Sequence, residues 1–208
     1  MDEDAAKAWL VELDVSRETH DRLHRFVELL RIANQSQNLV GATSLDEVYA
    51  RHIVDSAQLW RLAPNAGSWL DLGSGAGLPG LILAILSEAP VILVESRRLR
   101  TDWLQYAADA LNLTNIRIEA ARLDLVKSFP AAVITARAFA PLPKLLALAH
   151  RFSIRETLWI LPKGRSAAEE LASVAGTWHG SFHMETSVTD PNSAIIVARN
   201  VHPRGVRR

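Results

Sequence analysis

After Gly67, short apolar runs alternate with longer stretches of helical character, and this alternation restricts the possible folds more than any other feature. The apolar runs are "SWLDL", "VILVE", "NIRIEA", "AAVITA", "TLWILP", "HMETSV" and "AIIVAR". Such alternation predicts an α/β fold in which helices cover both faces of a mostly parallel seven-stranded sheet. No helical stretch separates the last two runs, so we expect them to form an antiparallel edge hairpin that turns at Pro191-Asn192.

The N-terminal third is predicted to be helical. Apolar residues fall at helical spacing from Arg17 to about Ala33. Ser44, followed three residues later by Glu47, resembles a capping box and predicts a helix that starts there and ends near Leu62. We therefore expect an N-terminal helical extension over residues 1–64, packed on a core domain that spans residues 65–208.

Composition excludes several kinds of chemistry. The chain has no cysteine, which rules out disulfides, thiolate zinc sites and cysteine nucleophiles, and its seven histidines show no metal-ligand spacing, so no metal site is expected. A formal net charge of zero argues against a protein that coats nucleic acid by bulk charge. No apolar run reaches the roughly 18 residues of a membrane helix, and the acidic start "MDEDAAKAWL" is unlike a secretory signal. We expect a cytoplasmic protein without membrane contact.

Three glycines follow the first apolar run, in "DLGSGAGLPG". In a doubly wound sheet, ligands bind beyond the carboxyl ends of the strands, where Gly73, Gly75 and Gly77 would lie. Glycine allows positive φ and a close approach of the backbone. One glycine would fit a plain turn, but three of them after Asp71 indicate a bound cofactor.

Two cofactor classes fit this loop. The segment "GAGLPG" satisfies the dinucleotide pattern G-x-G-x-x-G, but it starts two residues beyond the place where a pyrophosphate should meet the strand end and the helix. Counted from Asp71, the pattern is acid-x-G-x-G-x-G, which suits a cofactor whose amino-acid end lies against the loop. S-adenosylmethionine is such a cofactor.

Acids also follow the next two strands. Glu95 can accept hydrogen bonds from both ribose hydroxyls of either cofactor. Asp124, or the backbone of Leu123, can meet the amino edge of an adenine, although Asp124 could instead be a helix cap. Dinucleotide enzymes need no acid at that point, so Asp124 favours S-adenosylmethionine.

The sequence resembles the RsmG (GidB) family of 16S ribosomal RNA guanine-N7 methyltransferases from about Asn38 to Lys163. The resemblance rests on "NLVGATSLDEVYARHIVDS", "DLGSGAGLPG", "LVES", "ARLD", "ARAFA" and "PKG". It implies a Rossmann-like class I S-adenosylmethionine-dependent fold, and methylation of one guanine in a loop of bacterial 16S rRNA near the decoding region. The chain departs from the family at Ala33 and Gln37, where members commonly carry a Trp and a Tyr.

The resemblance also implies residue roles. It assigns the cofactor site to five residues: Gly73, Leu78, Leu123, Asp124 and Arg137. Asp71, Gly75, Gly77 and Glu95 complete the expected cofactor site on the reasoning given above. A segment with Asn38, His52, Asp55 and Ser56 would close over the cleft, and Lys163 and Gly164 would lie on the same rim.

Catalysis at guanine N7 needs no general base, because N7 carries a lone pair and no hydrogen. Asp55 is a candidate for favouring the movement of positive charge onto the guanine, with a surface salt bridge to Arg51 or Arg61 as the alternative. Arg137 follows the fourth strand directly and could pair with the cofactor carboxylate or with an RNA phosphate.

The expected partner is 16S rRNA or the small ribosomal subunit, bound by a monomer. His52, Lys163 and Arg165 are the candidate RNA contacts, and further phosphate contacts could come from Lys144, Arg151 and the C-terminal arginines, among them Arg207 and Arg208. Three alternatives stay open: a small-molecule methyltransferase of the same fold, an NAD-binding oxidoreductase, and a non-catalytic RNA-binding module.

Overall fold

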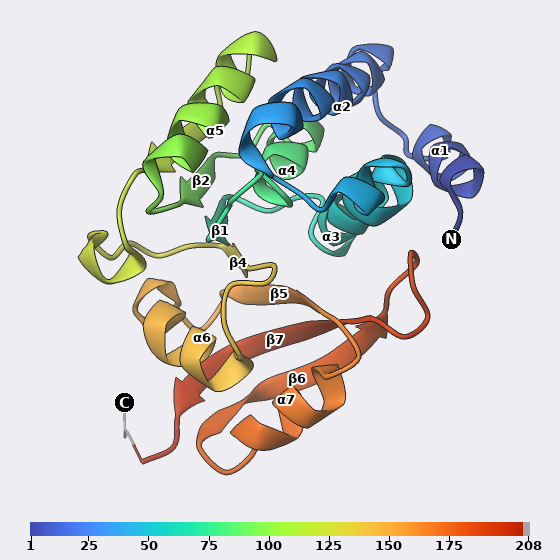
Figure 1. Cartoon of the computed structure of the whole chain (residues 1–208). Helices are drawn as coiled ribbons and strands as arrows, with labels where there is room; N and C mark the ends of the chain where they lie inside the picture. The colour runs from blue at the N-terminus through green and yellow to red at the C-terminus, as the bar shows by residue number, and fades with distance from the viewer. Residues whose placement is uncertain (206–208) are drawn as a thin grey trace.

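The computed structural model describes residues 1–205 and contains one seven-stranded sheet with the order β3-β2-β1-β4-β5-β7-β6 (Figure 1). The strands are β1 (Trp69–Leu72), β2 (Val91–Val94), β3 (Ile116–Glu119), β4 (Val133–Thr135), β5 (Leu158–Lys163), β6 (Trp178–Thr186) and β7 (Ala194–Pro203). Strands β1 to β5 pair in parallel, whereas β7 pairs antiparallel with both β5 and β6. The predicted sheet and its edge hairpin are confirmed, and the hairpin strands extend beyond the apolar runs.

Seven α-helices are found within residues 1–205. They are α1 (Glu3–Val11), α2 (Arg17–Gln37), α3 (Asp55–Leu62), α4 (Gly80–Leu86), α5 (Arg98–Ala110), α6 (Leu142–Ala149) and α7 (Ala167–Val174). Short 3₁₀ segments span Ala42–Leu45 (η1), Leu123–Leu125 (η3) and His150–Phe152 (η4), and a π-helical segment, η2, spans Tyr49–Val54. No helix in the described part of the chain is both long and apolar enough to cross a membrane.

Alternation along the strands divides the core into two layers. In β1, Trp69 belongs to the layer that contains α4 and α5, whereas Leu70 faces the layer that contains α6 and part of α7. Figure 1 shows these helices on opposite sides of the sheet. Side chains from a fully buried strand are apolar on both faces, which explains the near-continuous apolar runs in the sequence.

The N-terminal segment shares its core with the sheet. Residues of α1, α2 and α3 belong to the same buried cluster as α4 and α5. Phe26 of α2, for example, lies 6.4 Å from Trp103 of α5 between ring centroids. Because the cluster is continuous, α2 and α3 cover α4 and fix the position of the segment that joins them.

The predicted capping box is wrong. Ser44 lies inside η1, where its Oγ donates to the Gly41 carbonyl at 2.7 Å and does not cap a helix. The next helical turn begins at η2. Its first N–H groups bond to a residue distant in the sequence: the Glu3 carboxylate accepts from Tyr49 N at 3.0 Å and from Ala50 N at 3.1 Å. A contact over such a sequence separation has no local signature. The predicted end at Leu62 is confirmed, and α2 continues past Ala33 to Gln37.

Replacing Glu3 with alanine is expected to lower the free energy of unfolding by about 1–2 kcal/mol, because it leaves two backbone donors at the start of η2 without an acceptor. The measurement is chemical denaturation. Asp4→Ala is the matched control in the same turn of α1: Asp4 forms only a 3.9 Å ion pair with Lys7 at the surface, so its loss should cost less than about 0.5 kcal/mol. Equal effects of both variants would contradict the proposed cap.

Candidate functional site

The turn between β1 and α4 brings a helix N-terminus unusually close to a strand. The buried Asp71 carboxylate accepts from Gly80 N at 3.2 Å, and burial raises the pKa of Asp71 to about 6. A Cβ on Gly80 would lie 2.2 Å from Leu93 Cδ2 and 2.5 Å from Asp71 Oδ2. Only glycine fits this approach.

The loop from Gly73 to Leu78 presents its backbone to a cavity. Gly73 has φ +69°, and a Cβ there would lie 2.6 Å from Phe139 Cδ2. From the other side, Trp103 Nε1 donates to the Ala76 carbonyl at 3.0 Å. The loop is therefore held between Trp103 and Phe139. At its glycines no side chain covers the peptide groups.

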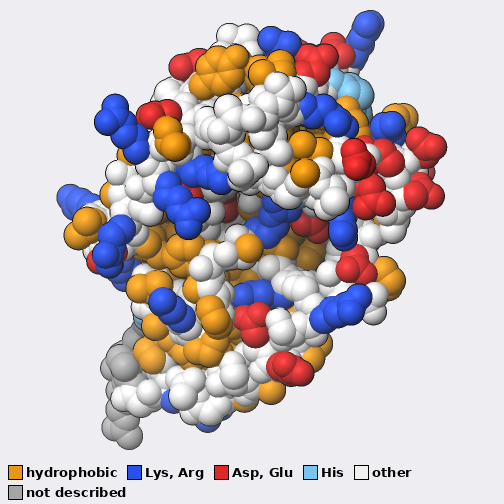
Figure 2. Space-filling view, viewed as in Figure 1, with side chains coloured by type: hydrophobic (Ala, Val, Ile, Leu, Met, Phe, Trp, Pro, Cys, Tyr) orange, Lys and Arg blue, Asp and Glu red, His pale blue; other side chains and the backbone are white. Residues whose placement is uncertain are grey.

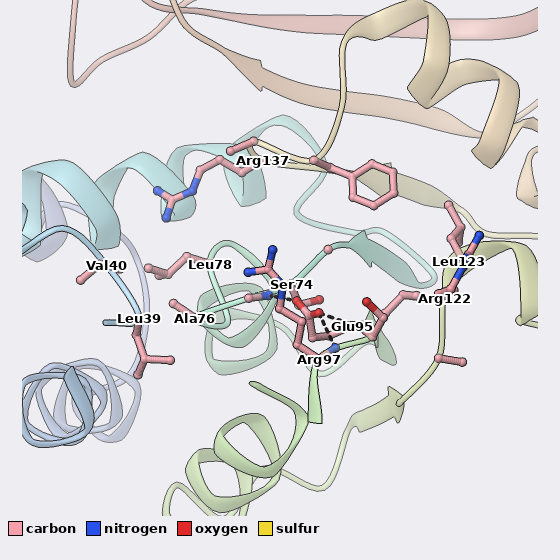
Figure 3. Close-up of a pocket in the computed structure, with 17 residues that line it drawn as sticks. Leu39, Val40, Ser74, Ala76, Leu78, Glu95, Arg97, Arg122, Leu123 and Arg137 are labelled. Carbon is pink, nitrogen blue, oxygen red and sulfur yellow. Dashed lines mark hydrogen bonds between the residues drawn. The ribbon is translucent and has the colours of Figure 1, made fainter. Parts of the chain in front are cut away.

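The carboxylate of Glu95 fixes the loop to the end of β2. Its Oε2 accepts from Gly75 N at 3.1 Å, and its Oε1 accepts from Ser96 N at 2.7 Å and from Arg97 N at 2.8 Å (Figure 3). Glu95 is 9% exposed and lines the cavity. A carboxylate has about four lone-pair positions, so Oε2 keeps one for a ligand hydroxyl.

The first cavity has a volume of about 420 Å³ and lies at the carboxyl ends of β1 and β2. Besides the glycine loop and Glu95, its walls come from Leu123 and from the segment 137–139. Leu39 and Val40 of the N-terminal segment also line it, and Arg100 Nη2 holds this segment by donating to the Asn38 carbonyl at 2.7 Å. The volume falls within the range of about 300–1,000 Å³ typical of ligand pockets.

A second cavity of about 530 Å³ adjoins the first. The two share Arg137, Ala138 and Phe139, and the second is also lined by Asp55 and by Lys163. Figure 2 shows a hollow across the middle of this face, with basic and acidic side chains around apolar surface. Two ligands can thus meet at the segment 137–139.

Asp55 and Arg137 form an ion pair. Arg137 Nη1 lies 3.2 Å from Asp55 Oδ2, and the two side chains are 23% and 21% exposed. Asp55 Oδ1 accepts from Thr189 Oγ1 at 3.2 Å and from Gln58 Nε2 at 3.1 Å. Among the described residues Asp55 pairs with neither Arg51 nor Arg61, the two partners expected as the alternative: Arg51 pairs with Glu47, and Arg61 lies over the ring of Trp9.

Lys163 and Glu170 form a second ion pair at the second cavity, with 2.8 Å between Nζ and Oε2. Lys163 also donates to the Ala140 carbonyl at 3.1 Å. Burial raises the pKa of Glu170, but the hydrogen bonds from Lys163 and from Leu142 N outweigh burial and leave that pKa below its usual value. The Glu170 carboxylate is therefore ionised at neutral pH.

The structure brings together most of the cofactor residues predicted from the sequence. Six of them line the first cavity: Gly73, Gly75, Leu78, Glu95, Leu123 and Arg137. Asp71 and Gly77 do not, because the loop covers the buried Asp71 carboxylate and Gly77 packs toward Leu81. Asp124 does not line it either. Its exposed carboxylate accepts from Arg122 at 3.1 Å, which lowers its pKa.

His52, one of the predicted RNA contacts, lies inside the fold. His52 is only 8% exposed, and its Nε2 lies 2.8 Å from Ser44 Oγ. Burial, aided by the nearby Arg137, lowers the pKa of His52 to about 4. The His52 ring thus packs inside the fold in this structure, and its contact with RNA stays a prediction.

The remaining basic candidates separate into two groups. Arg151 holds η3, because its guanidinium donates to the carbonyls of Leu123 and Val126. Lys144 and Arg165 are exposed, and neither lines the two cavities. Arg207 and Arg208 lie outside the described residues.

Reasoning from the sequence missed several cavity residues. Leu39 and Val40 lie in the quoted motif "NLVGATS", but no rule of spacing connects them to β1. Phe139 lies in "ARAFA", two residues after Arg137, and no spacing in the sequence marks it as a cavity residue. Thr189 reaches Asp55 from the hairpin turn, and only the fold shows this contact.

Comparison with known families gives a match to the model described as GidB, rRNA small subunit methyltransferase G, over residues 19–194. Curated relatives carry the name ribosomal RNA small subunit methyltransferase G. The protein of Novosphingobium aromaticivorans is 53% identical, over 93% of this chain and 86% of its own length. That of Rhizorhabdus wittichii is 48% identical, over 99% of this chain and 96% of its own length.

Solved structures confirm the fold. An O-methyltransferase from Bacillus cereus, in complex with SAH, has a TM-score of 0.64 at 15% identity and covers 94% of this chain and 97% of its own. A putative O-methyltransferase from Klebsiella pneumoniae also has a TM-score of 0.64, at 14% identity, with coverages of 95% and 97%. The class I methyltransferase fold expected from the sequence is thus confirmed.

Gly80→Ala is expected to destabilise the protein by about 1–3 kcal/mol, because the added methyl group overlaps Leu93 and Asp71 in a packed region. Thermal and denaturant unfolding measure this. Gly176→Ala is the control, since a Cβ there meets nothing within 4 Å. If Gly80→Ala were as stable as the control, the close approach of α4 to β1 would be refuted.

Burial of His52 predicts a pH dependence of stability. The pKa of His52 is about 4 in the fold and about 6.5 in the unfolded chain, so the unfolded state binds the extra proton between these values. The His52 contribution is therefore fully present above pH 6.5 and is lost as pH falls toward 4, by about 1.4 kcal/mol per unit.

Denaturation of wild type and His52→Gln across pH 4–7 measures this loss. We expect the difference between their unfolding free energies to shrink on acidification. His183→Gln makes the same replacement at an exposed site on β6 and is the matched control. A pH-independent difference for His52→Gln would contradict the buried, neutral histidine.

Proposed function

The chain belongs to the rRNA small subunit methyltransferase G family, and on that premise we propose that it transfers the methyl group of S-adenosylmethionine to N7 of one guanine in a loop of small-subunit rRNA. The observation that carries the proposal is the meeting of two cavities at Arg137, Ala138 and Phe139. One cavity suits a nucleoside cofactor and the other a planar base. Family membership argues against the NAD-binding oxidoreductase and the small-molecule methyltransferase.

The first cavity fits the donor. The Glu95 carboxylate offers its remaining lone pair to a ribose hydroxyl, and Leu123 offers apolar surface and backbone to the adenine. The bare backbone at Gly73 and Gly75 leaves room for the methionine portion. When bound, the sulfonium of S-adenosylmethionine supplies an electrophilic methyl group.

The second cavity fits the acceptor base. Phe139, Pro141 and Pro162 offer flat apolar surfaces, and charged groups surround them. Because N7 has a free lone pair, the chain needs no group that removes a proton. Its task is to hold the base in line with the donor, an effect worth up to about 7–11 kcal/mol in well-oriented systems.

The RNA must present this guanine outside a regular helix, because N7 lies in the deep, narrow major groove of A-form RNA. Lys163 lines the second cavity and Arg165 follows Gly164 at its edge, so both remain candidates for contacts with the RNA around the base. We propose that the chain acts as a monomer in the cytoplasm, where ribosomal subunits are found.

The test is incubation of the purified chain with labelled S-adenosylmethionine and small-subunit rRNA or subunits from cells that lack the protein. We expect label in one guanine, identified as 7-methylguanosine by nuclease digestion and mass spectrometry. Large-subunit RNA and a mixture of small metabolites serve as controls. Label at another atom, or only in metabolites, would refute the assignment.

Glu95→Gln is expected to weaken S-adenosylmethionine binding at least about tenfold, because it replaces a charge-assisted hydrogen bond to the ribose and loosens the loop at Gly75. Calorimetric titration measures this. Glu119→Gln is the matched control: it ends the neighbouring strand β3, pairs with Arg117 and does not line the first cavity. Equal affinities for Glu95→Gln and wild type would remove Glu95 from the donor site.

A further inference from the structure

We propose that three arginines beside the first cavity, Arg97, Arg98 and Arg122, form the surface on which the RNA backbone lies next to the methyl donor. We call this surface the arginine rim. The inference rests on the proposed function and names RNA contacts beyond those expected from the sequence. Arg137, assigned to the cofactor site above, is not part of the rim.

The arginine rim lies at the opening of the donor cavity. Arg97 and Arg122, which directly precede α5 and η3, line the first cavity (Figure 3). Because both residues are also exposed, they lie where the cavity meets the surface. Arg98 follows as the first residue of α5, and its side chain is 93% exposed. An RNA backbone on the rim therefore passes beside the donor.

The donor itself does not account for these arginines. Three arginines line the first cavity, namely Arg97, Arg122 and Arg137, but S-adenosylmethionine has one carboxylate, no phosphate and a positive sulfonium. One arginine suffices for that carboxylate, and Arg137 already supplies it. The other two guanidiniums have no anionic partner on the donor. RNA offers a phosphate at every nucleotide, and arginine binds phosphate with two parallel hydrogen bonds.

Contacts within the protein also leave the arginine rim available. Within residues 1–205 the Arg97 side chain makes no hydrogen bond and no ion pair. Arg98 has one ion pair, with Asp102 at 3.8 Å, and Arg122 has one, with Asp124 at 3.1 Å. The four side chains of these pairs are between 49% and 93% exposed. Exposed ion pairs contribute little to stability, so a phosphate can replace either acid at small cost.

The stability of α5 does not explain the arginines at its start either. Arg97 precedes the helix, Arg98 and Arg100 lie in its first turn, and that turn contains no acid. The positive partial charge at the start of a helix disfavours cations there. Glu95 bonds to the backbone N–H groups of Ser96 and Arg97, but its carboxylate serves the donor cavity. An anionic partner outside the chain would relieve this accumulation of positive charge.

Charges of opposite sign lie on opposite sides of the hollow. Figure 2 shows Lys and Arg side chains gathered over α5 and η3, and Asp and Glu side chains gathered over α1. On the acidic side, Asp2 caps α1, and Glu3 and Asp4 lie in its first turn. A polyanion is attracted to the arginine rim and repelled from α1. This asymmetry orients the RNA although the chain has a formal net charge of zero.

The experiment measures binding of the purified chain to labelled small-subunit rRNA by filter retention, at salt concentrations from about 50 to 200 mM. The rim variant combines Arg97→Gln, Arg98→Gln and Arg122→Gln. We expect its affinity at about 0.1 M salt to fall about 10- to 100-fold, and the slope of log affinity against log salt to flatten by about 2. With subunits as substrate, KM should rise while kcat changes little.

The matched control combines Arg17→Gln, Arg25→Gln and Arg155→Gln. It removes the same number of charges from exposed residues that line neither cavity. Its RNA affinity should fall less than about twofold, because salt screens charges that lie more than about 10 Å from the contact. Arg98→Gln alone, at a side chain that is 93% exposed, should weaken RNA binding about threefold and provides a single substitution that leaves the fold intact.

Affinity for S-adenosylhomocysteine, measured by calorimetric titration, separates an RNA role from a cofactor role. It should change far less than RNA affinity in the rim variant, because the cofactor has no phosphate. Transfer of labelled methyl groups by wild type tests the proposed function separately. A selective loss of RNA binding supports the inference even if wild type were to methylate no guanine.

Three results would overturn the inference. The first is an equal RNA affinity and salt slope for the rim variant and the control. The second is a loss of S-adenosylhomocysteine binding in a folded rim variant, which would place the arginines on the cofactor. The third is unchanged binding to free rRNA together with reduced activity on subunits, which would indicate contact with a protein of the subunit. Melting temperatures of all variants show that they are folded.

Discussion

The close approach of α4 to β1 is the constraint on which the rest of the site depends. Gly80 donates its backbone N–H to the buried Asp71 carboxylate, and no larger residue fits between Asp71 and Leu93. Because the helix starts so close to the strand, the intervening residues must turn tightly. The glycines of this turn expose their backbone to the first cavity. Glu95 then fixes this loop from the neighbouring strand. This packing shapes the loop that lines the first cavity, and the other walls come from Leu39 and Val40, from Leu123 and from the segment 137–139.

Ion pairs are the second feature that shapes the site. At the second cavity Arg137 pairs with Asp55 and Lys163 pairs with Glu170, so the proposed acceptor site carries charged groups but little net charge. This suits a reaction in which positive charge leaves a sulfonium and arrives on a neutral base. An excess of positive charge there would favour the sulfonium cofactor before the transfer, and an excess of negative charge would favour the methylated, cationic base after it. Paired charges avoid both effects.

The strands, the glycine loop and the acid at the end of β2 could be predicted from the sequence, because they obey short-range rules: apolar runs, turn residues and strand ends. The start of the helical segment near Tyr49 could not be predicted, because its N–H groups bond to Glu3, 46 positions away in the chain. His52 and Asp124 illustrate a different limit. Both lie in the predicted segments, but one side chain turns into the core and the other toward Arg122. Side-chain direction depends on packing that the sequence does not display.

The most direct test of the account is a crystal structure of the chain soaked with S-adenosylhomocysteine, the product of methyl transfer from S-adenosylmethionine. The account predicts a ribose hydroxyl on the Glu95 carboxylate, adenine beside Leu123, and the sulfur directed toward the junction at Arg137 and Phe139. A ligand bound elsewhere, with Glu95 still bonded only to the backbone of Gly75, Ser96 and Arg97, would contradict it.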